Sequence, residues 1–273
     1  MSSVTNVNFH QTFKPESQYI SSILSIADNN NGLSLKEISQ ATGIPQGESS
    51  GKVEPHIVYS SSMGLIKYEK KDGLVYISKT DIGEMVSLED PGLQEELTKL
   101  ILHAMMLRDN SGTVVWKYVF RKILPKYHGQ IKKDLLMLEL NELLEGKINT
   151  KNIAPFYGSY DDFFKEIGIL SVDESIVSCN SLAYNREFIY LYALVLFEYW
   201  DEIIPEQNEI SSTQLAEICF GKAFGWDSQT EYDVLEHMVD KGFIRLNRQL
   251  MPYTILKLVD KKQLIEGLYS ELC

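Results

Sequence analysis

Cysteine is scarce in this chain of 273 residues, which has Cys179, Cys219 and Cys273 and no others. The three lie far apart, and no CxxC pair or Cys/His cluster has the spacing of a zinc site. The five histidines are scattered in the same way. This pattern excludes a zinc-finger type of fold and fits a reducing compartment, so we expect the protein in the cytoplasm.

Long hydrophobic runs are missing too. The most apolar segment, residues 188–197, is ten residues long and is bounded by Glu187 and Glu198. A membrane span needs about 18 or more apolar residues. The segment therefore predicts a buried helix, and the polar first residues show no secretory signal.

Signature motifs of common enzymes are also absent. The chain has no GxxxxGK[ST] or GxGxxG phosphate loop, no HExxH and no GxSxG. The acidic groups Asp161-Asp162 and Glu198 with Asp201 and Glu202 could bind a divalent ion, but acidic helix surfaces of this kind are common. We therefore expect no catalysis, no cofactor and no metal site.

Positive charge is in deficit, with 26 basic and 38 acidic residues and a formal net charge of -12. Such a field repels phosphate at long range, so the protein does not coat nucleic acid or an anionic membrane indiscriminately. Apolar residues make up 44% and charged residues 23%, which is typical of a globular chain. Any contact with DNA must therefore be local.

A winged helix-turn-helix outline is present near the N-terminus. Ser34 and Glu37 have the spacing of a capping box, and Gly43-Ile44-Pro45 ends the helix that starts there. Gly64 ends a second helix, and Asp72-Gly73 is a strong hairpin-turn signal. The predicted elements after the first helix are a helix over residues 53–63, strands over 65–69 and 74–78, and a short helix over 80–86.

A second, weaker outline of the same kind lies near the C-terminus. Ser211 with Gln214 forms a possible capping box, and Ser228 with Glu231 starts the next helix, which Gly242 ends. Residues 243–246 and 254–258 are the expected wing strands. Turn formers gather near Asp90-Pro91-Gly92 and over 205–211.

These signals predict a fold that is mainly α with small antiparallel β-hairpins, in which two winged helix-turn-helix modules flank a helical centre. We call residues 1–90 the first module, 91–209 the helical centre and 210–273 the second module. Their net charges are -4, -6 and -2, which sum to -12. Helices of the centre are expected over residues 93–107, 113–124, 131–144, 161–167 and 182–200.

In the first module, the second helix is the candidate for entering a DNA groove. Its predicted inward positions are Val53, Ile57, Ser60 and Met63. No Arg, Asn or Gln is placed for bidentate reading of a base, so sequence-specific recognition would be weak. The candidate DNA contacts are Lys52, His56, Tyr59 and Ser62 on the outward side, with Lys67, Lys70 and Lys71 on the wing.

The most basic run lies in the helical centre, where residues 111–133 contain no acidic residue. Aromatic side chains alternate with its cations, and together the cations could neutralise several phosphates of duplex DNA. The alternative is an amphipathic helix with a buried aromatic face and solvated or paired lysines, since acidic residues follow from Glu139 to Glu145. The candidate groups are Lys117, Arg121, Lys122, Lys126, Lys132 and Lys133.

The corresponding helix of the second module favours a different partner. Glu231, Asp233, Glu236 and Asp240 lie on its polar side against Lys241 alone, and this face would repel phosphate. Arg245 and Arg248 on the following hairpin leave a backbone contact open. The rival hypothesis to DNA binding is therefore a protein–protein adaptor that uses its winged modules to dock partner subunits, with residues 228–241 as one docking surface.

The stretch Phe9-His10-Gln11-Thr12-Phe13-Lys14-Pro15 resembles the N-terminal signature of a bacterial family of unknown function with a His-x-Thr-Phe motif. Val115-Trp116 and the segment from Gly242 to Leu246 resemble later landmarks of that family. Its members are often encoded beside genes for DNA sulfur modification (phosphorothioation) or phage defence. The resemblance implies a non-catalytic accessory or regulatory role there, and we expect His10 to be structural, its ring bonding the backbone near Thr12 or Phe13.

Overall fold

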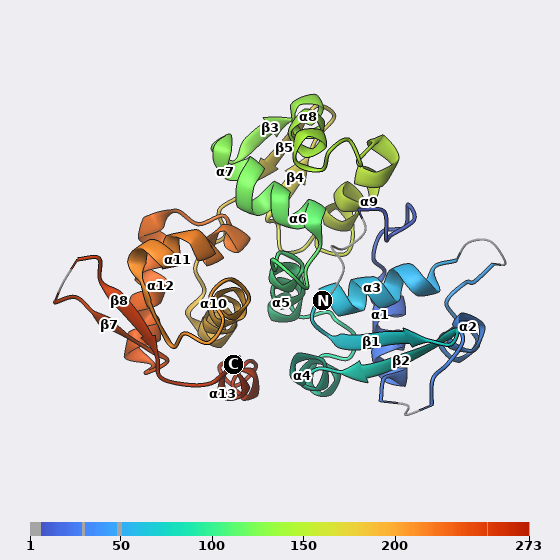
Figure 1. Ribbon diagram of the computed structural model, residues 1–273, viewed down its shortest axis with the longest axis horizontal. Coiled ribbons are helices and arrows are strands. Elements are labelled where there is room, and N and C mark those ends of the chain that lie inside the picture. The colour runs from blue at the N-terminus through green and yellow to red at the C-terminus, as the bar shows by residue number, and fades with distance from the viewer. Residues whose placement is uncertain (1–6, 29–30, 48–50, 250, 273) are drawn as a thin grey trace.

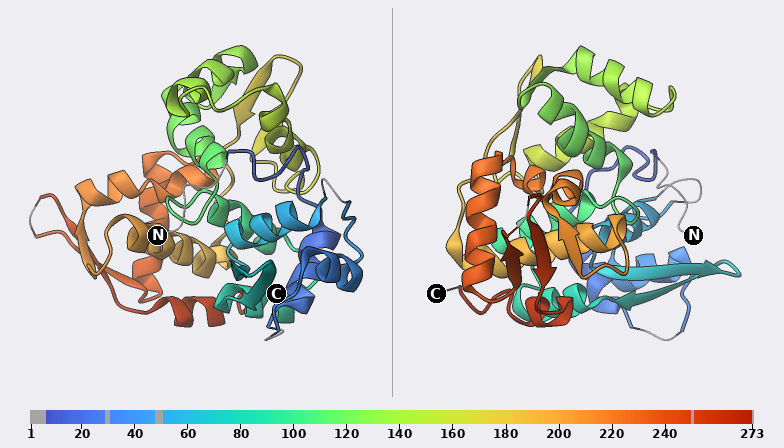
Figure 2. Two further views of the ribbon diagram at one scale, coloured as in Figure 1. Left: turned by 45° about the vertical axis from the view of Figure 1, so that its right-hand side comes forward. Right: turned by 60° about the vertical axis from the view of Figure 1, so that its left-hand side comes forward.

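The computed structural model describes residues 7–28, 31–47, 51–249 and 251–272. Within these ranges the chain is mainly helical and carries three small antiparallel sheets. Figure 1 shows three groups of elements around helices α5 and α10: the first module on the right, the helical centre at the top and the second module on the left. The two further views show the same three groups (Figure 2).

In the first module, two helices and a hairpin follow one another in the predicted order, with one further helix before them and the predicted short helix after them. The Ser34–Glu37 capping box is present, since the Glu37 backbone N–H donates to Ser34 Oγ and Glu37 accepts from the Ser34 N–H. Asp72 and Gly73 both have positive φ, as a two-residue hairpin turn requires. The elements are α1 (Ser17–Ile26), α2 (Leu35–Thr42), α3 (Val53–Ser62), β1 (Ile66–Lys71), β2 (Leu74–Lys79) and α4 (Asp81–Glu89).

The helical centre departs from the prediction in several of its helices and in one sheet. Helix α9 (Thr150–Asp161) lies earlier than the predicted helix over 161–167, because Asn149 caps its start and Pro155, a breaker in sequence terms, lies inside it. The sheet of β3 (Gln130–Lys132), β5 (Ile176–Cys179) and β4 (Leu170–Val172) was not predicted, because its strands are three or four residues long and carry no clear alternation.

The first half of the centre contains α5 (Glu96–Met106), α6 (Val114–Tyr118), a π-helical turn (Val119–Ile123), α7 (Leu124–Lys126), β3 (Gln130–Lys132) and α8 (Lys133–Leu143). After α9 come β4 (Leu170–Val172), β5 (Ile176–Cys179), a 3₁₀ turn (Arg186–Phe188) and α10 (Ile189–Ile203). The predicted helix over 131–144 therefore begins with a strand, and the one over 113–124 is interrupted by a π turn.

The second module repeats the order of helix, helix and hairpin. Its elements are β6 (Glu209–Ser211), α11 (Ser212–Ile218), a 3₁₀ turn (Phe220–Phe224), α12 (Ser228–Asp240), β7 (Ile244–Asn247), β8 (Thr254–Lys257) and α13 (Lys261–Glu266). The Ser211–Gln214 capping box is confirmed. Helix α12 begins at Ser228 as predicted, but Asp227 caps it by accepting from the Thr230 N–H, and Glu231 turns inward and accepts from the Gly221 N–H.

Helix α10 is the centre of the core, as the most apolar segment of the sequence predicted. Its side chains from Leu191 to Phe197 are buried, and Tyr199 and Trp200 are buried at its end. It contacts α5, α11, α12 and α13. Among the described residues, no helix combines the length and apolar character that crossing a bilayer demands.

Candidate docking and nucleic-acid surfaces

Helix α3 turns its candidate DNA contacts inward. The predicted inward residues are buried, but His56 and Tyr59 are also 0% exposed and Ser62 is buried, so their assignment to a groove-facing side is wrong. The cause is a second packed layer: the Tyr19 ring of α1 lies 5.1 Å from the His56 ring, and the Phe9 ring lies 4.9 Å from that of Tyr59. No open face of α3 remains at these positions for DNA.

Hydrogen bonds inside the first module fix these side chains further. His56 Nδ1 lies 2.7 Å from the Lys52 carbonyl oxygen, and burial lowers the pKa of His56. The Tyr59 hydroxyl donates to the Phe13 carbonyl at 3.0 Å, and burial raises its pKa. Lys52 itself pairs with Glu16 at 2.7 Å. Three of the candidate groups are therefore part of the module's own packing.

The His-x-Thr-Phe stretch belongs to the same packing. His10 is 0% exposed, and its Nδ1 accepts a hydrogen bond from the Thr12 N–H at 3.3 Å, which confirms its predicted structural role. Burial lowers the pKa of His10 to about 4. The rings of Phe9 and Trp116 lie 5.1 Å and 6.4 Å from the His10 ring, so the stretch joins the first module to the helical centre.

The basic run of the centre is partly neutralised by a carboxylate just ahead of it. Asp109 lies 2.6 Å from Arg121 Nη1 and 3.5 Å from Lys117 Nζ. Arg121 also donates to the carbonyls of Leu107 at 3.1 Å and Ile218 at 2.8 Å, and its guanidinium lies over the Tyr199 ring. Arg121 therefore connects the centre to the end of α11 and does not face solvent as a phosphate contact.

Two further candidate lysines bind carboxylates. Lys126 lies 2.7 Å from Glu139, which also accepts from the Tyr127 hydroxyl, and Lys70 pairs with Glu54. Five candidates have no ion pair with a described carboxylate: Lys67, Lys71, Lys122, Lys132 and Lys133. They do not gather on one side, since β1 lies in the first module and β3 and α8 lie at the far end of the centre (Figure 1).

Helix α12 keeps only part of its expected acidic face. Asp233 and Asp240 are exposed, whereas Glu236 pairs with Arg248 of the hairpin. Glu231 is largely enclosed against Gly221, and burial raises its pKa. The predicted docking surface over residues 228–241 is therefore narrower and less acidic than the sequence indicated.

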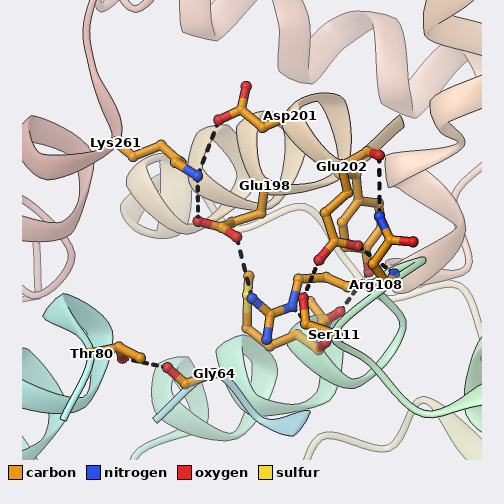
Figure 3. Close-up of polar contacts among 12 residues, drawn as sticks. Gly64, Thr80, Arg108, Ser111, Glu198, Asp201, Glu202 and Lys261 are labelled. Atoms are coloured by element: carbon orange, nitrogen blue, oxygen red, sulfur yellow. Dashed lines mark hydrogen bonds and ion pairs between the residues drawn. The ribbon is translucent and has the colours of Figure 1, made fainter. Parts of the chain in front are cut away.

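An ion-pair network joins the helical centre to the second module near the middle of the molecule (Figure 3). Glu198 of α10 lies 3.3 Å from Arg108 Nη1 and 3.0 Å from Lys261 Nζ. Asp201 lies 3.0 Å from the same Lys261 and also pairs with Lys257 of β8. Glu202 accepts from the Asn110 N–H at 2.8 Å and from Ser111.

Three of the large hydrophobic side chains that are exposed among the described residues lie on α8. Leu136 and Leu140 point into the core and are 0% exposed. Leu138 is 67% exposed on the opposite side, and Leu135 and Leu143 are each 36% exposed. Apolar side chains on both faces of a helix are typical of a helix that is covered on both sides. The chain itself covers only one face of α8.

Comparison with known proteins identifies the fold of the chain. Neither a family model nor a curated protein matches it. A magnesium ion-bound crystal structure of SspB superposes with a TM-score of 0.76 at 15% identity, covering 99% of this chain and 88% of SspB. A second SspB crystal structure gives a TM-score of 0.75 with the same identity and coverage. At this identity the likeness shows a shared fold and nothing finer.

In the portion that the structure describes, no three His, Cys, Asp or Glu side chains are grouped to hold a metal ion. Glu198 and Asp201 bind cationic side chains instead, and Asp162 lies 2.5 Å from Lys14. These residues do not fit a resident magnesium ion, so no chemical step is assigned to one.

Proposed function

We propose that the protein is a non-catalytic adaptor that docks a partner protein on the outer face of α8. The observation that carries this proposal is the exposure of Leu135 and Leu138 on a helix whose other face is already packed. Asp134 and Glu142 are exposed beside them. The fitting partner is therefore an apolar surface rimmed by basic side chains, which would bury the leucines and pair with the carboxylates.

The charge distribution supports an adaptor over a DNA-coating protein. Seven of the twelve candidate DNA contacts are buried or bound to carboxylates of the same chain, in a protein of net charge -12. In both modules the order of helix, helix and hairpin favours winged-helix domains, which here serve as scaffolds. By its resemblance to the His-x-Thr-Phe family, the protein is proposed to serve a bacterial DNA-modification or phage-defence complex, in the cytoplasm.

Site-specific photo-crosslinking tests the docking surface. A photoreactive residue replaces Leu138 in the full chain, and the same residue replaces Leu88 of α4, which is 74% exposed and serves as the matched control. We expect the photoreactive residue at position 138 to capture one protein that the residue at position 88 does not capture. The captured protein should then bind the purified chain directly. Equal capture from the two positions, or a captured protein that does not bind when purified, would contradict the proposal.

Local DNA binding is the second candidate function. The observation that favours it is the exposure of Lys122 and Lys132 in a segment without acidic residues, with Lys133 beside them. A gel shift with duplex DNA at two salt concentrations tests it. Binding that weakens alike for all sequences in a variant with all three lysines changed to Ala, and falls steeply with salt, would favour DNA over the adaptor.

A further inference from the structure

A cleft between the first module and the second is lined by more cations than carboxylates. Its volume is about 320 Å³, and it lies between Gly64 and Thr80 of the first module and the start of α13. Figure 3 shows three of the residues that line it, with Arg108 and Lys261 on either side of Glu198. The charged side chains that line it are Lys67, Lys79, Asp81, Arg108, Glu198 and Lys261.

The charges of this cleft do not cancel. Four cations face two carboxylates, so the lining carries a formal charge of 4 - 2 = +2 in a protein whose total is -12. Three neighbours just outside the lining, Asp28, Asp201 and Lys257, reduce the formal charge to 5 - 4 = +1. Asp28 lies 3.7 Å from Lys79, and Asp201 is shared between Lys261 and Lys257.

The cations of the cleft divide into fixed and available groups. The Arg108 guanidinium is held by Glu198, by the Met105 carbonyl at 3.0 Å and by the Ser62 carbonyl at 3.4 Å, so it supplies a fixed positive field. Lys67 is exposed and has no ion pair with a described carboxylate, and Lys79 has a loose one. The ammonium groups of Lys67 and Lys79 can therefore reach a ligand in the cleft.

We propose that this cleft binds a terminal phosphate group. A phosphate monoester or inorganic phosphate carries a charge of about -1.5 to -2 at pH 7, which is opposite in sign to the formal charge of the lining. Lys67 and Lys79 would contact its oxygens as point charges. Arg108 and Lys261, which Glu198 holds in position, would add to the positive electrostatic potential. The group can belong to free phosphate or to the 5′ end of a DNA strand, and both sources share this chemistry.

The test is calorimetric titration of the full chain with inorganic phosphate, and with one oligonucleotide prepared with and without a 5′-phosphate. The double variant Lys67→Gln with Lys79→Gln should weaken binding at least tenfold at low salt. Lys71→Gln is the matched control, because Lys71 is exposed on the same strand as Lys67 but does not line the cleft. Saturable binding of inorganic phosphate identifies a free ligand, and binding of the phosphorylated strand alone identifies a strand end.

Three results would overturn the proposal: no saturable binding of either probe, equal binding of the two oligonucleotides with no binding of phosphate, or equal losses in the double variant and the Lys71→Gln control. The site is separate from the docking face of α8. A variant with Leu135→Ser and Leu138→Ser should keep phosphate binding, so the two proposals fail independently.

Discussion

The buried ring of His103 makes the stability of the fold depend on pH in a way that can be calculated. His103 Nε2 lies 2.9 Å from the Ala223 carbonyl oxygen, which can only accept, so Nε2 carries the proton. Nδ1 then accepts from the Tyr160 hydroxyl at 2.9 Å. The neutral ring is therefore satisfied on both sides, and it connects the helical centre to the second module. Burial lowers the pKa of His103 from 6.5 to about 4.

The direction of the pH effect on stability follows from the protons bound by the folded and the unfolded chain. Between pH 6.5 and 4 the unfolded chain binds a proton at His103 that the folded chain does not, so the free energy of unfolding falls as the pH falls. The contribution is fully present above pH 6.5. A separation of this size corresponds to a loss of ~2 kcal/mol between pH 7.5 and 5, and of ~3 kcal/mol by pH 4.

Urea unfolding at a series of pH values measures this loss. Other groups titrate in the same range, among them His10, so the measured quantity is the difference between wild type and His103→Gln, which lacks the titrating ring. The wild type should lose ~2 kcal/mol more than the variant between pH 7.5 and 5. Parallel pH profiles for the two proteins would refute the assignment of a neutral, doubly bonded ring.

Three further substitutions test the packing. Arg121→Ala removes the nearer of the two cations beside Asp109 and leaves two buried carbonyls without this donor, so it should cost about 3 kcal/mol in urea unfolding, whereas the neighbouring Lys122→Ala should change stability by less than about 0.5 kcal/mol; equal costs would contradict the connecting role of Arg121. Gly83→Ala places a Cβ 1.9 Å from the Leu65 carbonyl oxygen, so the midpoint of thermal unfolding should fall by several degrees, and an unchanged midpoint would contradict this close approach. Ser34→Ala removes a helix cap and should cost about 1 kcal/mol, with no loss expected if α2 were capped otherwise.

The sequence predicted the elements whose signals are local. The capping boxes at Ser34 and Ser211, the Asp72-Gly73 turn and the buried helix over residues 188–197 each depend on a few neighbouring residues, and all are present. The short strands of the sheet β3-β5-β4 were missed, because each needs a partner distant in the chain. Local sequence patterns were therefore sufficient to predict most of the helices and hairpins.

The candidate site was less predictable, because charge pairing and burial are tertiary properties. Helical spacing placed His56 and Tyr59 outward, but residues 9–20 cover that side of α3. Arg121 appeared to be a phosphate contact, since Asp109 lies outside the basic run and Ile218 is 97 residues away. The exposed leucines of α8 lie within the helix predicted over residues 131–144, but which of its side chains would be covered depended on the packing of the rest of the chain.

We propose that the leucines of α8 form the docking face. The most direct test is the affinity of the captured partner for the chain with and without these leucines. Replacing Leu135 and Leu138 by Ser removes about 1 to 1.5 kcal/mol of apolar burial for each residue, which together correspond to a Kd that rises by roughly 30- to 150-fold. Leu88→Ser, an exposed leucine elsewhere, should leave the Kd unchanged. A ratio of the two Kd values near 100 is the predicted result, and a ratio near one would contradict the account.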